Sequence, residues 1–214
     1  MTHGRALKGD DMKIIRRYSD SERVNHWLVA ICFVLAALSG LAFFHPAFAF
    51  LVHLFGGGPW ARILHPFIGV VMFLAFLLMM LRYWHANTMD AGDKQWLRQW
   101  RDVVANREDR LPEVGRYNAG QKAMFWLMVI CMIVLVITGI MFWRPWFAGF
   151  LPISLVRLAS LLHAIAATVL IIGVIVHVYA GIWVKGSIGA MLRGTVTERW
   201  ARKHHAAWFR EINK

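Results

Sequence analysis

The chain has 214 residues, of which 58% are hydrophobic and 17% are charged, and its mean hydropathy is +0.49. This composition excludes an ordinary soluble domain and favours a chain whose natural solvent is the lipid bilayer. The net charge of +12 could indicate a nucleic-acid partner, but the basic residues are spread over three separate segments, so we expect no nucleic-acid binding. Cys32 and Cys131 each stand alone in an apolar run, which argues against a disulfide framework or a thiolate metal site.

Four stretches contain no Asp, Glu, Lys or Arg and are long enough to cross a bilayer, which takes roughly 20 helical residues. They are residues 24–61, with an apolar part at 27–44, and residues 63–81, 123–143 and 158–184. Their length and lack of alternation exclude the strands of a membrane β-barrel. We therefore predict an all-α integral membrane protein with a single domain over residues 1–214. Its transmembrane helices are expected at about 25–45, 61–84, 120–144 and 155–185, followed by a tail at 186–214.

The distribution of positive charge predicts the orientation in the membrane. Of the 24 Lys and Arg residues, 21 lie in the N-terminal segment, the middle loop or the C-terminal tail, all on one side of the predicted helices. Only Arg62, Arg144 and Arg157 lie on the other side. Because basic residues are enriched in cytoplasmic loops, we predict a multi-pass membrane protein with both termini in the cytoplasm. We expect its membrane to be the bacterial inner membrane. The same charges would attract anionic lipid.

The middle loop contains apolar residues at helical spacing, with charged residues between them. This pattern predicts an amphipathic cytoplasmic helix that lies on the membrane surface or against a partner. The alternative is a solvated loop with incidental aromatic residues. The apolar residues are Trp96, Leu97, Trp100, Val103 and Val104.

Ten histidines are present, and six of them lie in polar tails, loops or helix ends, where a surface position is expected. These six are His3, His45, His53, His85, His204 and His205. The other four, His26, His65, His163 and His177, lie at or within the apolar runs. An ionisable side chain in a membrane is costly and indicates function, although an interhelical hydrogen bond is the simpler alternative for a single one.

Depth in the membrane sorts these four histidines into two pairs. His26 and His177 fall near the cytoplasmic side, and His65 and His163 fall near the outer side. His163 and His177 are separated by about 21 Å along one helix but by only about 40° around it, so they share a face. One histidine from each of two facing helices is the arrangement that bis-imidazole haem ligation requires. The spacing of about 20 Å between the pairs excludes a single tetrahedral zinc site.

Small residues near the histidines favour the same interpretation. Gly40, Gly69 and Gly173 would leave room for a porphyrin beside the helices, although ordinary small-residue helix packing is the alternative. Pro66 disfavours the α conformation at His65, so we expect His65 at a helix start or a kink.

The chain also contains seven segments in an order that resembles a known family. They are RVNHW (23–27), RILHPFIG (62–69), VGRYNAGQK (114–122), ITGIMFWRP (137–145), LLHA (161–164), HVYAGIWVKGSI (177–188) and RWARKHHAAWFREI (199–212). The chain resembles the cytochrome b (gamma) subunit of respiratory formate dehydrogenase, of the formate dehydrogenase-N type, over nearly all of its length from about Met12 onward.

This resemblance implies a four-transmembrane-helix bundle that is a di-haem cytochrome b. It implies His26 and His177 as ligands of an inner haem b, and His65 and His163 as ligands of an outer one. It also implies partner subunits: an iron–sulfur (beta) subunit and a molybdenum or tungsten catalytic (alpha) subunit that oxidises formate, with a possible higher oligomer of the heterotrimer. The chain itself would transfer electrons to menaquinone or ubiquinone at the cytoplasmic side.

The expected quinone site involves residues just before the third apolar run. The spacing of Asn118 and Gln121 by itself favours a local helix cap that needs no ligand. The resemblance instead implies that Asn118, Gly120, Gln121 and His177 line a quinone site.

Two other functions compete with this one. The first is the cytochrome b anchor of a hydrogenase or thiosulfate reductase; the middle-loop and C-terminal segments favour formate dehydrogenase. The second is a proton-coupled transporter that uses membrane histidines, but such a protein would want carboxylates in its helices, and the four apolar runs contain none. A membrane anchor without a cofactor would not explain the pairing of histidines by depth.

Overall fold

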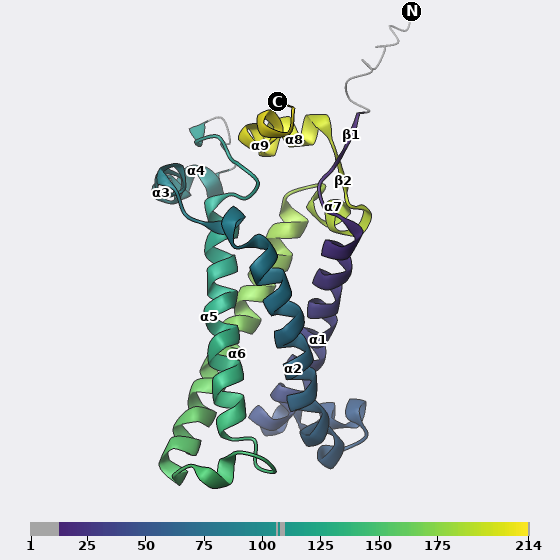
Figure 1. The fold of residues 1–214 in the computed structure, drawn as a ribbon, viewed down its shortest axis with the longest axis vertical. Coiled ribbons are helices and arrows are strands. Elements are labelled where there is room, and N and C mark those ends of the chain that lie inside the picture. Colours follow the sequence, from purple (N-terminus) through teal and green to yellow (C-terminus); the bar gives the residue numbers. More distant parts are fainter. Residues whose placement is uncertain (1–12, 106, 108–109, 214) are drawn as a thin grey trace, which may run out of the picture. The chain divides into compact units, whose positions relative to one another are not determined.

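The computed structural model describes residues 13–105, 107 and 110–213, and His3 lies outside them. Its four longest helices are each long and apolar enough to cross a membrane. They confirm the prediction of an all-α fold with four transmembrane helices (Figure 1). These helices are α1 (Asp20–Phe44), α2 (Gly58–Tyr83), α5 (Ala119–Met141) and α6 (Ile153–Trp183).

Polar caps determine where the helices begin. Before α1, Ser19 Oγ accepts a hydrogen bond from the backbone N–H of Glu22 at 3.3 Å, and Glu22 Oε2 accepts one from the backbone N–H of Ser19 at 2.6 Å. This reciprocal capping box satisfies N–H groups that the first helical turn leaves without intrahelical partners. As a result α1 starts at Asp20, before the predicted start near residue 25.

The proline in α2 does not end the helix. His65 and Pro66 lie well inside α2, which begins at Gly58, so the expectation of a helix start at His65 is wrong. A helix in lipid tolerates an internal proline because neighbouring groups can satisfy the carbonyl that the proline frees.

The chain divides into two compact units. The helix unit consists of residues 24–83 and 126–178, and the polar unit consists of the described residues of 1–23, 84–125 and 179–214.

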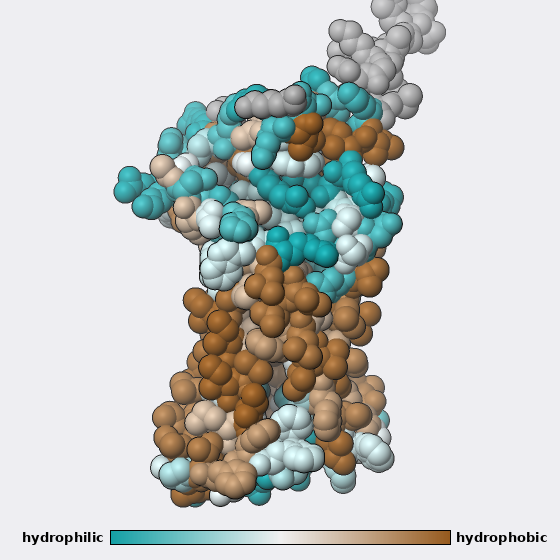
Figure 2. All heavy atoms as spheres, in the orientation of Figure 1, coloured by the Kyte–Doolittle hydropathy of each residue, from teal (hydrophilic) through white to brown (hydrophobic). Residues whose placement is uncertain are grey.

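The helix unit exposes apolar side chains on its outward surface. In the most apolar part of each long helix only 17% to 22% of residues are buried. Figure 2 shows hydrophobic side chains over most of the helix surface that faces the viewer. Such a surface suits a lipid solvent. The connections contain the 3₁₀ helices η2 (Pro46–Phe55), which packs against α2, and η5 (Ala148–Phe150).

The polar unit contains a short two-stranded ribbon that joins the two ends of the chain. Strand β1 (Ile14–Arg16) pairs antiparallel with β2 (Thr195–Thr197), with Ile15 opposite Val196. Gly194, with φ of 81°, turns the chain into β2, and its carbonyl accepts hydrogen bonds from the N–H groups of Arg17 and Tyr18. The sequence analysis did not predict this ribbon, because strands of three residues carry almost no pattern.

The predicted amphipathic helix of the middle loop is present as two short helices. They are α3 (Ala91–Arg98) and α4 (Trp100–Val104), after the 3₁₀ turn η3 (His85–Asn87). Gln99 separates α3 from α4 and is the cap residue of both. Leu97, Trp100 and Val104 are exposed, as an amphipathic segment requires.

The C-terminal tail folds back into the polar unit as α7 (Ser187–Arg193), α8 (Glu198–His204) and α9 (Ala206–Ile212). Its core consists of Ala190, Val196, Ala201 and Trp208. His205, at the break between α8 and α9, is only 4% exposed, and its Nδ1–H donates to the carbonyl of Gly115 at 2.8 Å. The expected surface position of His205 is therefore wrong, because the break between the helices turns its ring inward onto Trp200.

The buried ring of His205 predicts a pH dependence of stability. Burial, together with the nearby charge of Arg17, lowers the pKa of His205 to about 3. A histidine in the unfolded chain titrates near 6.5, so between these pH values the unfolded state binds more protons than the folded state. The free energy of unfolding of the polar unit should therefore fall as the pH is lowered from 6.5 toward 3, by up to about 1.4 kcal/mol per pH unit. Thermal unfolding in detergent at a series of pH values measures this slope.

A variant without the titrating ring separates His205 from other acid-sensitive groups. His205→Asn keeps a hydrogen-bond donor and should flatten the slope. The exposed His85→Gln in the same unit is the control and should leave the slope unchanged. A slope that stays at its original value in His205→Asn would contradict the assignment.

Candidate functional site

The structure brings the four membrane histidines together as two pairs within the helix unit. His26 of α1 lies opposite His177 of α6, with ring centroids 6.3 Å apart and ring planes at 45°. His65 of α2 lies opposite His163 of α6, also with centroids 6.3 Å apart and with planes at 62°. His26, His65 and His163 are half-buried, whereas His177 is exposed in the bare chain.

The centroid distance of 6.3 Å fits two imidazoles that share one metal ion. A bond from a metal to an imidazole nitrogen is about 2.0–2.1 Å, and that nitrogen lies about 1 Å from the ring centre, so two rings on opposite sides of one iron have centroids about 6 Å apart. A direct N–H···N hydrogen bond between the rings would bring the centroids to about 5 Å. The distance therefore favours ligation over the interhelical hydrogen bond that was the simpler alternative.

Hydroxyl groups set the orientation of His65 and His163. Ser39 Oγ lies 2.8 Å from Nδ1 of His65, and Thr138 Oγ1 lies 3.0 Å from Nδ1 of His163. Each hydroxyl proton is already donated to a carbonyl of its own helix, one turn earlier. Since a hydroxyl has one proton, both oxygens accept from the imidazole N–H. Nδ1 then carries the proton in each ring, and Nε2 keeps the lone pair that a metal ligand needs.

The same short motif surrounds both of these rings. Ser39-Gly40-x-x-Phe43 on α1 contacts His65, and Thr138-Gly139-x-x-Phe142, which ends one residue after α5, contacts His163. A Cβ on either glycine would lie 3.4 Å from Cε1 of the histidine, so a larger residue would crowd the ring. Phe43 and Phe142 meet the rings edge-on at centroid distances of 6.1 and 5.0 Å. The sequence analysis missed the motif, although its two copies could have been found by comparing the helices with each other.

The other pair, His26 and His177, lacks such hydroxyl anchors in the described structure. Nδ1 of His26 is buried and has no hydrogen-bond partner among the described residues. The edge of the Trp27 ring lies beside His26, with centroids 5.5 Å apart. A buried polar nitrogen without a partner is costly, which indicates that a bound group completes this site.

The glycines expected to make room for a porphyrin have different surroundings. Gly40 lies against the ring of His65, as described above. A Cβ on Gly69 would meet no atom within 4 Å, so open space adjoins this residue. Gly173 is buried within α6. Open space beside Gly69, four residues after His65, fits a bulky group at that histidine.

The residues expected to bind quinone show a complete helix cap. Asn118 Oδ1 accepts from the N–H of Gln121, and Gln121 Oε1 accepts from the N–H of Asn118, both at 2.9 Å. These two bonds use the amide oxygens and leave the amide N–H groups for other partners. A Cβ on Gly120 would lie 3.2 Å from the indole of Trp96, so a glycine allows α3 to pack closely here. These residues belong to the polar unit, and His177 belongs to the helix unit.

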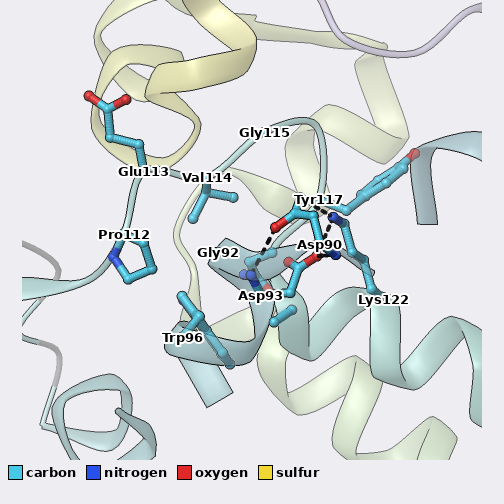
Figure 3. A pocket seen from close by; sticks show the side chains of 12 residues that line it. Asp90, Gly92, Asp93, Trp96, Pro112, Glu113, Val114, Gly115, Tyr117 and Lys122 are labelled. Atoms are coloured by element: carbon cyan, nitrogen blue, oxygen red, sulfur yellow. Dashed lines mark hydrogen bonds and ion pairs between the residues drawn. The ribbon is translucent and has the colours of Figure 1, made fainter. Parts of the chain in front are cut away.

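A small pocket lies beside Asn118 in the polar unit (Figure 3). Its volume is about 60 Å³, enough for one or two water molecules but not for a quinone ring. Lys122 Nζ lies in its wall, 2.6 Å from Asp93 Oδ2 and 3.4 Å from Asp90 Oδ2. The side chains of Lys122 and Asp93 are 9% and 8% exposed, so this ion pair is buried and ties α3 to the start of α5. The sequence analysis used Lys122 as one of the basic residues that indicate the orientation in the membrane, and it did not predict this ion pair.

Metal binding by clustered side chains is not indicated elsewhere. Among the described residues no three His, Cys, Asp or Glu side chains are grouped so that they could hold an ion.

Comparison with known proteins places these observations in a family context. Residues 17–194 match the sequence model of a family described as prokaryotic cytochrome b561. The chain is 48% identical over 200 residues to the formate dehydrogenase cytochrome b556(fdo) subunit of Escherichia coli K12, covering 94% of each chain. It is 45% identical over 202 residues to the nitrate-inducible cytochrome b556(Fdn) subunit of the same organism, covering 94% of this chain and 93% of that one. A formate dehydrogenase cytochrome b556 subunit of Haemophilus influenzae is 41% identical over 202 residues, covering 94% and 84%.

Proposed function

Because this chain belongs to the prokaryotic cytochrome b561 family, and a cytochrome b holds haem b, we propose that it binds two haem b groups, one at each histidine pair. His26 and His177 would ligate one iron, and His65 and His163 the other. The observation that supports this number is the equal centroid distance of 6.3 Å in two separate pairs on different helices. Haem supplies a one-electron carrier, which suits a membrane electron-transfer protein.

The residues of the chain would hold these groups in fixed orientations. The four imidazoles would supply the nitrogens that hold the two groups, and the hydroxyls of Ser39 and Thr138 keep Nδ1 of two of them protonated. The apolar helices exclude water, which stabilises a cofactor of low charge.

We further propose that the chain is the membrane subunit of a formate dehydrogenase complex. The relatives at 48%, 45% and 41% identity are all named as formate dehydrogenase cytochrome subunits, which favours this function over a hydrogenase or thiosulfate reductase anchor. An iron–sulfur subunit would deliver electrons to the outer pair, His65 and His163, and a molybdenum or tungsten subunit would oxidise formate. The chain would not act on formate itself. The complex would lie in the inner membrane, with both termini of this chain in the cytoplasm.

Quinone is the proposed electron acceptor, as menaquinone or ubiquinone. In the polar unit, Asn118 and Gln121 retain amide N–H groups that can donate to a quinone carbonyl, because their reciprocal cap uses only the oxygens. Gly120 is half-buried against Trp96, so its lack of a side chain allows the close packing of α3 beside Asn118. The assignment of His177 to the same site rests on the sequence resemblance alone.

Loss of single ligands tests the two-haem proposal. Replacing either member of a pair removes one axial ligand, so His65→Ala or His163→Ala should deplete one haem, and His26→Ala or His177→Ala the other. Each variant should retain about one haem per chain, since the second pair is intact. Redox titration of the optical spectrum identifies which component is missing. The exposed His53→Ala is the control and should retain both. Depletion of the same component by His65→Ala and His177→Ala would contradict the pairing.

Reporter fusions test the proposed orientation. Because 21 of the 24 basic residues lie on one side of the helices, alkaline phosphatase fused after residue 213 should stay in the cytoplasm and remain inactive. A matched fusion at Arg144, on the opposite predicted side, should be active. High phosphatase activity of the C-terminal fusion would overturn the topology.

Two substitutions at Asn118 separate helix capping from quinone binding. Asn118→Asp keeps the oxygen that caps α5 but loses the amide donor, whereas Asn118→Ala loses both. In both variants formate should still reduce the haems, and the quinone KM should rise about three- to tenfold, as expected for one lost hydrogen bond. Asn213→Ala, at another amide of the polar unit, should have no effect. Unchanged quinone kinetics in a correctly assembled Asn118→Asp complex would remove Asn118 from the site.

A further inference from the structure

The loop of residues 113–117, which leads into Asn118, is held by the two ends of the chain. Three consecutive carbonyls of this loop accept hydrogen bonds from the terminal segments. The carbonyl of Val114 accepts from the N–H of Ala207 at 3.2 Å, and that of Gly115 accepts from Nδ1 of His205 at 2.8 Å. The carbonyl of Arg116 accepts from the guanidinium of Arg17. A surface loop normally leaves such groups to water, so this loop is unusually restrained.

Side chains add a second set of attachments. Arg17 is only 4% exposed and lies over the ring of Trp208 at 4.2 Å and over that of Tyr117 at 5.6 Å, both within cation–π range. Glu113 pairs with Arg210 of α9, and Glu22 pairs with Arg116 at 3.1 Å. Each of the five loop residues is thus attached to at least one of three places: Arg17, which follows β1, Glu22 of α1, or the tail.

His205 is the buried residue through which the tail contacts the middle of the loop. Its ring lies against that of Trp200, with centroids 5.1 Å apart and planes tilted by 37°, and it meets Trp208 edge-on at 6.4 Å. These contacts direct Nδ1 toward the carbonyl of Gly115, which lies three residues before Asn118. Only Arg116 and Tyr117 intervene, and both are restrained as described above. A movement of His205 would therefore be passed to Asn118 rather than absorbed by a flexible linker.

The tail lies beyond the part of the chain that matches the prokaryotic cytochrome b561 model, although it is part of the resemblance to formate dehydrogenase cytochrome b subunits. The match to the prokaryotic cytochrome b561 family ends at residue 194, before β2, α8 and α9. Haem binding by the family therefore does not explain why this segment is built into the polar unit.

We infer that His205 is a positioning residue for quinone reduction, which holds the loop of residues 113–117 so that the amide of Asn118 meets the quinone. The inference rests on the proposed quinone site at Asn118. The tail then acts on the affinity for quinone and leaves the haems unaffected.

Two substitutions of His205 separate its hydrogen bond from its packing. His205→Phe keeps an aromatic ring between Trp200 and Trp208 but cannot donate to Gly115. His205→Asn loses the ring but places an amide N–H where Nδ1 was. In the complete complex in native membranes, His205→Phe should raise the KM for a short-chain quinone about three- to tenfold, with haem content and haem reduction by formate unchanged. His205→Asn should remain within about twofold of the original KM, and so should the exposed control Lys203→Ala.

A double-mutant cycle shows whether His205 acts through Asn118. If it does, adding His205→Phe to Asn118→Asp should raise the KM little further, whereas two independent effects would multiply. Three results would each overturn the inference. They are increases in KM that multiply in the double variant, an unchanged KM in His205→Phe, and equal increases in KM in His205→Phe and His205→Asn. Normal quinone kinetics in Asn118→Asp would instead overturn the proposed quinone site itself, so the two failures can be told apart.

Arg210→Gln provides a variant that does not disturb a buried position. It breaks only the exposed ion pair with Glu113. This variant replaces His205→Phe as the test if His205→Phe fails to assemble with its haems. The KM for the same quinone should then rise about twofold, as expected for a weaker, exposed attachment. An unchanged KM in this variant would overturn the inference in that case.

Discussion

The need to satisfy each imidazole nitrogen in a solvent without water governs the helix unit. Hydrocarbon offers no hydrogen bonds, so a ring nitrogen must bond to protein or to a ligand. Ser39 and Thr138 meet this need for one nitrogen of His65 and of His163, and in doing so they fix which nitrogen keeps its lone pair. The neighbouring glycines and phenylalanines then follow from the shape of the ring that they enclose.

The polar unit consists of segments from three distant parts of the sequence, so contacts between these segments must hold it together. Each is attached by contacts that are buried or paired: the ribbon of β1 and β2, the Lys122–Asp93 ion pair, and the bonds of His205 and Arg17 to the loop. Breaking a buried ion pair leaves an uncompensated charge, so these contacts specify one arrangement even where their net contribution to stability is small.

The parts of the fold that depend on local pattern were predictable from the sequence. Helix length follows from apolar runs, and the pairing of His65 with His163 follows from depth along known helices. Other features depend on which distant segments meet. Ser39 resembles any small helix residue until His65 lies beside it, and His205 resembles a tail residue until α8 and α9 separate around it. The positive charge of Lys122 indicates the cytoplasmic side of the membrane whether the side chain is solvated or paired with Asp93, so the sequence did not reveal the ion pair.

Helix α6 supplies one histidine to each pair, and this places a strict limit on how the chain can change in evolution. His163 and His177 must keep both their separation and their common face. Insertion or deletion of a single residue between them would turn one histidine by about 100° and shift it by about 1.5 Å relative to the other. If both pairs hold haem as proposed, length variation between these positions is not tolerated, whereas the loops that connect the helices can lengthen without disturbing either pair.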